Sequence, residues 1–346
     1  KKYLLIMNPV ELTDFIEKLI SKNLNISTMI WGPPGIGKSS IVYSAAEKAG
    51  IDFIDLRLSQ LAPTDLRGLP VPVHPEDSKK QGTSKWYPPE FLPKTGKGIL
   101  FLDEINMAPP AMQGVAQQLI LDRKVGNYKV PEDWLIWAAG NRKEDRASVY
   151  EMPSPLNNRF LHLDVEVNFS CFKSHALKQD FAEEIISFLG FRPALLHTVN
   201  FEEKAWPSPR SWGMANKLFK LNLPINVAIG DGATEEFNSF LKVYKNLPNL
   251  SQIIKGHGEK IIFPKQVSRQ WATITGLTKR ANRPEEVKEV FQWLFKKTTP
   301  EWIQVFAADI VAKFKEKKQL TALAKVVMKD TQMQEYLKNY QELIIK

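Results

Sequence analysis

The sequence predicts an α/β domain, built as a parallel sheet flanked by helices, followed by a region that is helical throughout. Over roughly the first 170 residues, strand-like apolar runs alternate with helix-like segments, which is typical of a parallel sheet with helices on both faces. From Lys173 onward the pattern turns helical and stays so. A glycine-rich motif at Gly32–Ser39 joins an apolar run to a helical pattern, as phosphate-binding loops do.

Local patterns predict each element of the α/β part. Strands are expected where short apolar runs lie between turn residues, and helices where apolar residues recur every three to four positions. In chain order we expect an entry helix introduced by Asn8-Pro9 and running through Glu11–Ile20, a strand over Ser27–Trp31, a helix starting near Lys38, strands over Phe53–Leu58, Ile99–Leu102 and Trp134–Ala139, and a helix from about Pro110 to Asp122.

Residues 59–98 interrupt this alternation. Prolines and glycines punctuate the stretches Pro63–Pro70 and Trp86–Pro93, and these residues break regular structure. We therefore predict an insertion that carries a hairpin and exposed loops.

The motif G-x-x-x-x-G-K-[ST] predicts a P-loop NTPase. Its glycines let successive backbone N–H groups turn toward an anion, and the helix that starts near Lys38 presents its positive dipole end. Lys38 is expected to contact the β- and γ-phosphates, and the Ser39 hydroxyl to ligate Mg²⁺. The alternative is a glycine-rich turn that binds nothing, which the strand before it and the helix after it disfavour. The predicted nucleotide-binding residues are Gly32, Pro33, Pro34, Gly35, Ile36, Gly37, Lys38, Ser39 and Ser40.

Three polar residues follow two other expected strands. Asp103 and Glu104 end the Ile99–Leu102 run, where Asp103 is expected to hold Mg²⁺ through water and Glu104 to orient or deprotonate the attacking water. Asn141 follows the Trp134–Ala139 run and could hold the same water or the γ-phosphate. Acidic strand ends and asparagine turns are common by themselves. Their combination with the phosphate loop favours nucleotide hydrolysis.

The composition indicates a globular protein of two or three domains. One cysteine, Cys171, excludes an internal disulfide framework, and the five histidines lack the paired spacing of metal ligands. The apolar runs are too short for a membrane span, and the start of the chain lacks a signal-peptide pattern. We expect a cytoplasmic protein with no membrane partner.

The positive charge is concentrated near the end of the chain. The formal net charge is +9, and residues 249–346 hold 18 lysines and arginines against 10 acidic residues. Such a region can attract nucleic acid or an acidic partner, although lysines interspersed with glutamates at helical spacing are also typical of a solvated helix face. Lys315–Lys318 is the densest cluster.

The order of these motifs resembles that of AAA+ ATPases of the MoxR family, over roughly residues 8–248. The resemblance rests on the phosphate loop, Leu102–Asn106, Ala139–Asn141, Asn157–Phe160 and Ser208–Arg210. The segments Asp103–Pro110 and Thr64–Gly68 are also similar to the family's pattern. It implies that residues 61–92 form the family's insertion, with a β-hairpin pointing toward a ring pore, and that Asn141 is the sensor 1 residue.

The resemblance also assigns two arginines. Arg159 aligns with the arginine that reaches the γ-phosphate of the neighbouring subunit, and Arg210 aligns with sensor 2 at the start of a lid helix, which contacts the γ-phosphate of its own subunit. Either arginine could instead form a structural salt bridge, and Arg146 is a rival for the first role.

The resemblance divides the chain into three domains. We predict an AAA+ α/β domain over 1–172, a helical lid over 173–248, and a basic helical region over 249–346 in which no family motif is found. In this last region, Ile303, Phe306, Ile310 and Phe314 recur at helical spacing, as do Leu320, Leu323, Val326 and Val327, and such stripes are typical of packing faces.

The function these observations favour is a ring-forming Mg²⁺-dependent ATPase, a hexamer by resemblance, that remodels or matures a client protein. The family implies ATP as the nucleotide and a von Willebrand A domain protein as a partner. One alternative is a nucleic-acid-directed motor or loader, whose binding would weaken steeply with salt. Another is a low-turnover switch that binds ATP and signals by conformation.

Overall fold

A computed structural model describes residues 6–73, 83–142, 145, 149–200, 202–244, 246–331 and 333–334 of the chain. The chain divides into two compact units, Lys1–Val167 and Asn168–Lys346. No helix in the described ranges is both long and apolar enough to cross a bilayer.

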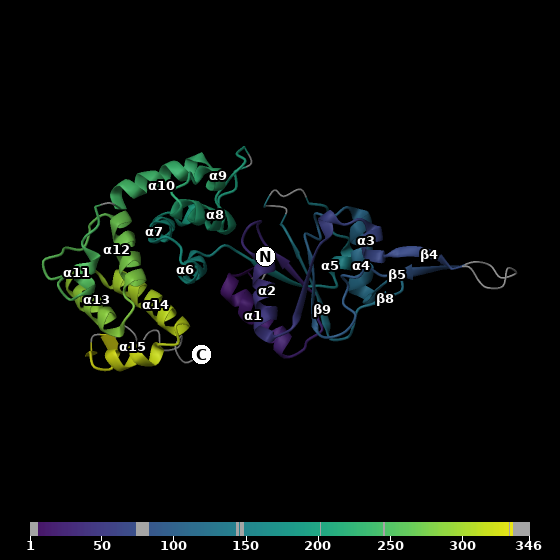
Figure 1. Cartoon of the computed structure of the whole chain (residues 1–346), viewed down its shortest axis with the longest axis horizontal. Helices are drawn as coiled ribbons and strands as arrows, with labels where there is room; N and C mark the ends of the chain where they lie inside the picture. Colours follow the sequence, from purple (N-terminus) through teal and green to yellow (C-terminus); the bar gives the residue numbers. More distant parts are fainter. Residues whose placement is uncertain are drawn as a thin grey trace. The chain divides into compact units, whose positions relative to one another are not determined.

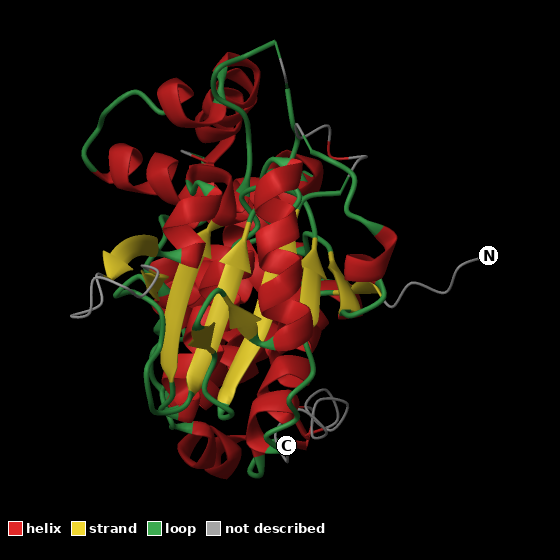
Figure 2. Ribbon diagram, turned by 90° about the vertical axis from the view of Figure 1, so that its right-hand side faces the viewer, coloured by secondary structure: helices red, strands yellow, loops and turns green. Residues whose placement is uncertain are grey.

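The first unit is built on a six-stranded sheet whose neighbouring strands all run parallel (Figure 2). Its strands lie in the order β1-β10-β2-β9-β6-β3. Their bounds are β1 Ile6–Met7, β2 Thr28–Trp31, β3 Asp52–Arg57, β6 Gly98–Asp103, β9 Trp134–Gly140 and β10 Leu161–Val165. The predicted parallel sheet is confirmed, and β6 and β9, the most apolar of the expected strands, lie next to each other inside it.

Helices cover both faces of this sheet (Figure 1). Ile99 and Phe101 of β6 pack in a core with α1 and α2, whereas the alternate residues Leu100 and Leu102 pack in a second core with α4. This alternation follows from the two-residue period of a strand, which sends successive side chains to opposite faces. The helices are α1 Pro9–Ser21, α2 Lys38–Ala49, α3 Pro63–Arg67, α4 Pro110–Asp122 and α5 Ser154–Asn157, with a 3₁₀ turn at Leu58–Gln60.

The entry helix α1 begins two residues earlier than Glu11 because Asn8 caps it. The Asn8 side chain accepts hydrogen bonds from the backbone N–H groups of Val10 and Glu11, at 2.9 and 3.0 Å. Glu11 in turn accepts one from the Asn8 backbone at 2.8 Å. This reciprocal capping box, with Pro9 as the first helical residue, determines where the helix starts.

Two hairpins accompany the sheet. Within the predicted insertion, β4 Leu69–Val73 pairs antiparallel with β5 Thr83–Tyr87, and most of its side chains are exposed. The residues between these strands lie outside the described part of the chain. A second, short hairpin joins β7 Lys124–Val125 to β8 Tyr128–Lys129 and has no counterpart among the sequence-based expectations.

Every regular element described in the second unit is helical, as predicted. These helices are α6 Phe169–Lys178, α7 Glu183–Phe191, α8 Pro209–Lys220, α9 Asn226–Ile229, α10 Asp231–Tyr244, α11 Leu250–Ile254, α12 Val267–Arg280, α13 Pro284–Lys297, α14 Pro300–Glu316 and α15 Leu320–Val327, with a 3₁₀ turn at Pro193–Leu196. The predicted stripe of α14 is buried in the core, together with Leu323 and Val327 of α15. These apolar stripes are therefore packing faces.

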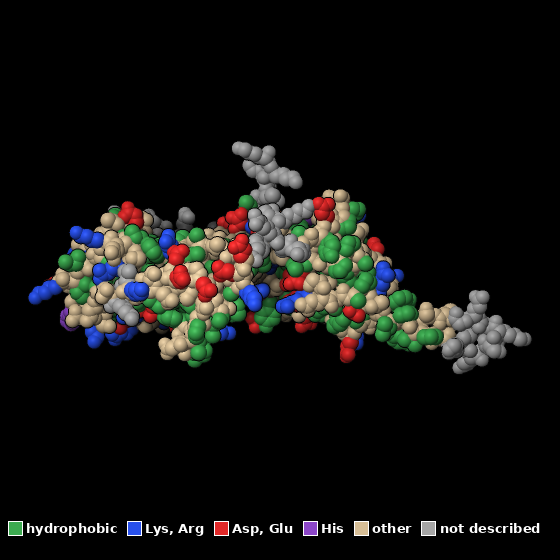
Figure 3. Space-filling view, turned by 90° about the horizontal axis from the view of Figure 1, so that it is seen from above, with side chains coloured by type: hydrophobic (Ala, Val, Ile, Leu, Met, Phe, Trp, Pro, Cys, Tyr) green, Lys and Arg blue, Asp and Glu red, His purple; other side chains and the backbone are tan. Residues whose placement is uncertain are grey.

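The basic region packs directly on the helices predicted to form the lid. Helix α12 lies against α7, where a side-chain carbon on Gly190 would meet the Trp271 ring at 2.6 Å. Figure 3 shows lysines and arginines scattered among acidic and apolar side chains on the displayed face of this unit. The described residues on that face form no continuous basic stripe of the kind that tracks a nucleic acid backbone.

An ion pair joins α6 to α14 in the interior of this unit. The ammonium of Lys173 donates to the Asp309 carboxylate, and their side chains are only 6% and 14% exposed. Burial raises the pKa of Asp309, and the charge of Lys173 opposes that rise. The Lys173 ammonium therefore favours the charged form of the buried Asp309 carboxylate.

Lys173→Met is expected to destabilise the protein by about 3–5 kcal/mol, because it leaves the Asp309 carboxylate buried without a cation. Urea denaturation of the full chain measures this change. The double variant Lys173→Met/Asp309→Leu should recover most of the loss. Lys178, also on α6, forms an exposed ion pair with Glu316 of α14. Lys178→Met removes this pair and should cost no more than about 1 kcal/mol. Equal effects of the two lysine substitutions would contradict this account.

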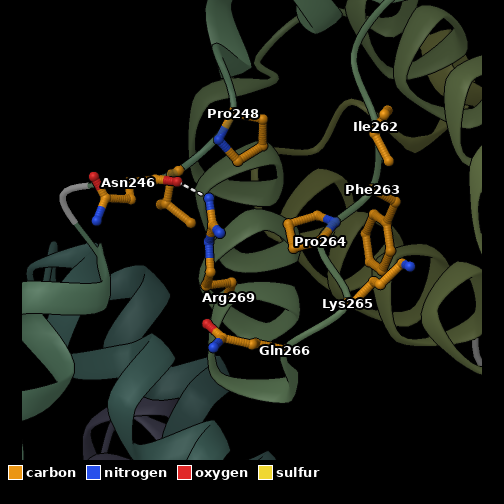
Figure 4. A pocket seen from close by; sticks show the side chains of 9 residues that line it. Asn246, Pro248, Ile262, Phe263, Pro264, Lys265, Gln266 and Arg269 are labelled. Atoms are coloured by element: carbon orange, nitrogen blue, oxygen red, sulfur yellow. Dashed lines mark hydrogen bonds between the residues drawn. The ribbon is translucent and has the colours of Figure 1, made fainter.

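A cavity of about 500 Å³ lies in the second unit, between residues 246–248 and the segment 262–266 that leads into α12 (Figure 4). Its lining is mainly apolar, and Arg269 crosses it to donate a hydrogen bond to the Asn246 carbonyl. None of the residues predicted to bind nucleotide lines this cavity.

Candidate functional site

The site is assembled where four neighbouring strands end. Strands β2, β9, β6 and β3 are adjacent and parallel, so the residues that follow them meet at one edge of the sheet. Ligands of open α/β sheets bind at this carboxyl edge. The edge brings together the phosphate loop after β2, Asp103 and Glu104 at β6, Asn141 after β9, and Ser59 after β3.

The phosphate loop depends on its glycines. Gly35 and Gly37 have φ angles of +82° and +93°, in the left-handed region that favours glycine. A Cβ on Gly32 would lie 2.7 Å from the Val165 carbonyl oxygen. Helix α2 begins at Lys38 with no side chain capping it, so the N–H groups of its first turn remain available for an anion.

Lys38 lies across the loop, with 9% of its surface exposed. Its ammonium donates to the carbonyls of Gly32 and Pro33 at 2.7 and 3.1 Å, and to Oδ1 of Asn141 at 3.0 Å. These three oxygens place a positive charge inside the loop and connect it to the end of β9. Lys38 and Asn141, predicted from separate motifs, are therefore direct neighbours.

Ser39 and Asp103 are also in contact. The Ser39 hydroxyl donates to one Asp103 carboxylate oxygen at 2.7 Å, and the other accepts from the Glu104 backbone at 2.9 Å. Mg²⁺ in nucleotide sites is held by one or two protein oxygens together with phosphates, so this pair fits that ion. Among the described residues, no group of three or more His, Cys, Asp or Glu side chains could hold a metal without a nucleotide.

Glu104 is held in an unusual conformation beside this pair. Its φ of +57° lies in the left-handed region, and its carboxylate accepts a hydrogen bond from the Ser59 hydroxyl. Nearby on β3, partial burial and then the charge of Asp103 raise the pKa of Asp55. Burial is the main cause of this raised pKa, and the charges of Asp103 and Glu104 add to it while that of Arg57 opposes it.

Asn106 fixes the position of Asn141. Its side-chain amide donates to the Asn141 carbonyl at 2.7 Å, and its oxygen accepts from the Asn141 backbone N–H at 3.2 Å. A Cβ on Gly140 would lie 2.5 Å from that oxygen, so the glycine makes room for the contact. The Asn141 side-chain amide also contacts the Met107 sulfur at 3.3 Å.

Two contact residues, Ser59 and Asn106, were missed as site residues by sequence reasoning. The Leu102–Asn106 segment contributes to the family resemblance, but no local pattern in it assigns Asn106 a role at the site. Ser59 could be found only from the pairing of β3 with β6, which places Arg57 opposite Asp103.

The predicted arginines lie apart from this cluster in the chain. Arg159 is exposed in the turn between α5 and β10, and Arg210 is exposed at the second position of α8 in the second unit. Neither side chain has a hydrogen bond or ion pair to another described residue, so the salt bridges considered as alternatives are absent from that part of the chain. Arg146 lies outside the described residues.

Comparisons with known proteins agree with this geometry. Residues 28–162 match the model of the ATPase family associated with various cellular activities, AAA. Midasin of Giardia intestinalis is 25% identical over 148 residues, which span 40% of this chain but only 3% of midasin.

Solved structures are also similar to this chain. NtrX of Brucella abortus in complex with ADP is 15% identical, with a TM-score of 0.42, and the match covers 89% of this chain and 67% of that one. A mutant of RuvB from Thermotoga maritima is 16% identical, with a TM-score of 0.38 and coverage of 82% and 85%.

The parallel sheet, the phosphate loop and the family match together define an ATP-binding P-loop domain. Residues 28–162 have both the family match and the fold of an AAA ATPase domain.

Lys38→Met is expected to raise the Kd for ATP roughly 100-fold, because at least two charge-assisted hydrogen bonds of about 1.5 kcal/mol each would be lost. Titration with a fluorescent ATP analogue measures the change. Lys48→Met, at the exposed end of the same helix, is the matched control and should leave the Kd unchanged. An unaltered Kd in Lys38→Met would exclude the loop as the nucleotide site.

Proposed function

We propose that this chain is a Mg²⁺-dependent ATPase of the MoxR type that assembles into a ring, a hexamer, and uses ATP hydrolysis to remodel or mature a client protein. The position of Arg159 is the observation that carries the proposal. It lies just before β10, and β10 starts beside the start of β2, with Leu161 paired to Thr28. The phosphate loop follows the other end of β2.

Arg159 is thus at the opposite edge of the sheet from its own phosphate loop. Four residues of β2 span about 13 Å, more than the length of an arginine side chain. An exposed arginine that has no partner among the described residues is suited, at that edge, to a γ-phosphate bound by a neighbouring copy. There it would stabilise the charge that develops during phosphoryl transfer.

The remaining residues act within one subunit. The loop amides and Lys38 bind the phosphates, and Lys38 exchanges its carbonyl contacts for phosphate oxygens. Ser39 and Asp103 would hold Mg²⁺, which neutralises phosphate charge when bound. Glu104 takes the proton of the attacking water, and Asn141, held by Asn106, orients that water. By the family resemblance, Arg210 serves as sensor 2 and couples the nucleotide state to the lid.

The resemblance to MoxR proteins supports a protein as the client, with a von Willebrand A domain protein as the first partner to test. The exposed β4–β5 hairpin is the surface we assign to client contact in the ring. The mixed charges in Figure 3 give no specific support to a nucleic acid substrate.

Mixed rings of two inactive variants test the proposal. Arg159→Ala keeps its own site but offers no arginine, and Glu104→Gln cannot hydrolyse ATP but offers Arg159. The two co-assembled variants should show ATPase activity well above the sum of their separate activities. Mixed assemblies seen by native mass spectrometry without recovered activity would contradict a site completed by a neighbour.

A further inference from the structure

His162 lies between the phosphate loop, which follows β2, and the Arg159 turn, which precedes β10. It lies in β10 opposite Met29 of β2, so Trp31, two residues along β2, presents its side chain on the same face. The Trp31 indole N–H donates to Nδ1 of His162 at 2.8 Å. The other ring nitrogen, Nε2, lies 2.8 Å from the Asn157 carbonyl oxygen.

These contacts define the tautomer of the imidazole ring. Because Nδ1 accepts from Trp31, the proton of the neutral imidazole is on Nε2, which donates it to Asn157. The ring lies nearly parallel to the Trp31 indole, with 6.1 Å between centroids and 15° between planes. The two hydrogen bonds therefore hold His162 in a single orientation.

The two partners of His162 belong to the two functional segments. Trp31 directly precedes Gly32, the first residue of the phosphate loop. Asn157 ends α5, and its side chain is anchored to the Met152 carbonyl at 3.2 Å. The turn that follows it carries Arg159. A chain of two hydrogen bonds thus runs from Trp31, the residue before the phosphate loop, to Asn157, which lies two residues before Arg159.

We propose that His162 is a positioning residue that holds the Arg159 turn in register with the phosphate loop of the same subunit. This inference rests on the proposed function, since it requires Arg159 to act on a neighbouring copy. Loss of His162 should therefore lower ATPase activity when it occurs in the subunit that donates Arg159, and not when it occurs in the subunit that receives it.

The mixed-ring experiment tests this direction. His162→Phe keeps a ring against Trp31 and Phe160 but removes both hydrogen bonds. Placed in the Glu104→Gln donor, it should lower the recovered activity about 5- to 10-fold, the effect of a small misplacement of a catalytic group. Placed in the Arg159→Ala receiver, it should leave recovery within about twofold, the range of context effects on single contacts.

Trp31→Phe in the donor is the second variant. It removes the bond between the indole and Nδ1 of His162 and leaves Asn157 bonded, so it should lower recovery in the same way. ATP binding and thermal unfolding of each variant are measured in parallel. A general structural role of His162 would reduce recovery equally from donor and receiver positions.

Full recovery with either variant in the donor, or equal losses in both positions, would overturn the role of His162 while leaving the proposed function intact. No recovery even with His162 present would overturn the proposed function and this inference together.

Discussion

Glu104→Gln is expected to reduce steady-state ATP hydrolysis about 10²- to 10⁴-fold while ATP still binds. The Glu104 carboxylate can take a proton at this strand end without serving the metal pair, whereas Asp103 is engaged by Ser39. The amide of glutamine keeps the shape and can still accept a hydrogen bond from Ser59, so the site should remain assembled. A phosphate-release assay measures turnover, and a fluorescent ATP analogue measures binding.

Glu47→Gln is the matched control for this substitution. Glu47 lies on the exposed face of α2, and its replacement removes the same charge without touching the site. It should hydrolyse ATP at the wild-type rate. If Glu104→Gln retained most of the wild-type turnover, Glu104 would not be the base. Fast turnover in wild type and variant alike would also exclude the low-turnover switch.

Arg159→Ala is expected to lower kcat by about 10³- to 10⁵-fold, the range found for arginines that complete a phosphoryl-transfer site. ATP binding to a single subunit should change little, because Arg159 lies at the far edge of its own sheet. Stability should also change little, since the exposed side chain has no partner among the described residues.

Arg192→Ala serves as its control. It removes an exposed arginine that pairs with Glu236 at 2.9 Å, and it should leave kcat unchanged. A large loss of stability in Arg159→Ala with normal kcat would favour the structural interpretation of this arginine over the catalytic one.

Most of the α/β fold could be predicted because strong local signals mark it. The runs of β6 and β9 are so apolar that these strands must be buried. Helix α4 begins at Pro110 and ends at Asp122, as expected. The phosphate loop is specified by its own residues, since glycine is required at its left-handed positions.

What could not be predicted depends on the order of the strands. Ser59 reaches Glu104 only because β3 pairs with β6, and no local pattern encodes that pairing. Asn106 looks like an ordinary turn residue until β9 is placed beside β6, where it bonds to Asn141. The β7–β8 hairpin was missed because each strand has only two residues, too few for an alternating pattern.

The second unit illustrates a different limit. Helical periodicity correctly predicted helices and buried stripes, because the burial of an apolar face is a local property of one helix. It could not show which helices pack together, such as α12 against α7. The subdivision at residue 248 and the role of residues 249–346 stay predictions.

The most direct test of a site shared between subunits is specific ATPase activity measured against protein concentration, for wild type and Arg159→Ala, with mass photometry under the same ATP·Mg²⁺ conditions. Wild-type specific activity should rise as oligomers form. Arg159→Ala should form the same oligomers and bind nucleotide without that rise. Specific activity that is independent of concentration and equal in the two proteins would contradict a site shared between subunits.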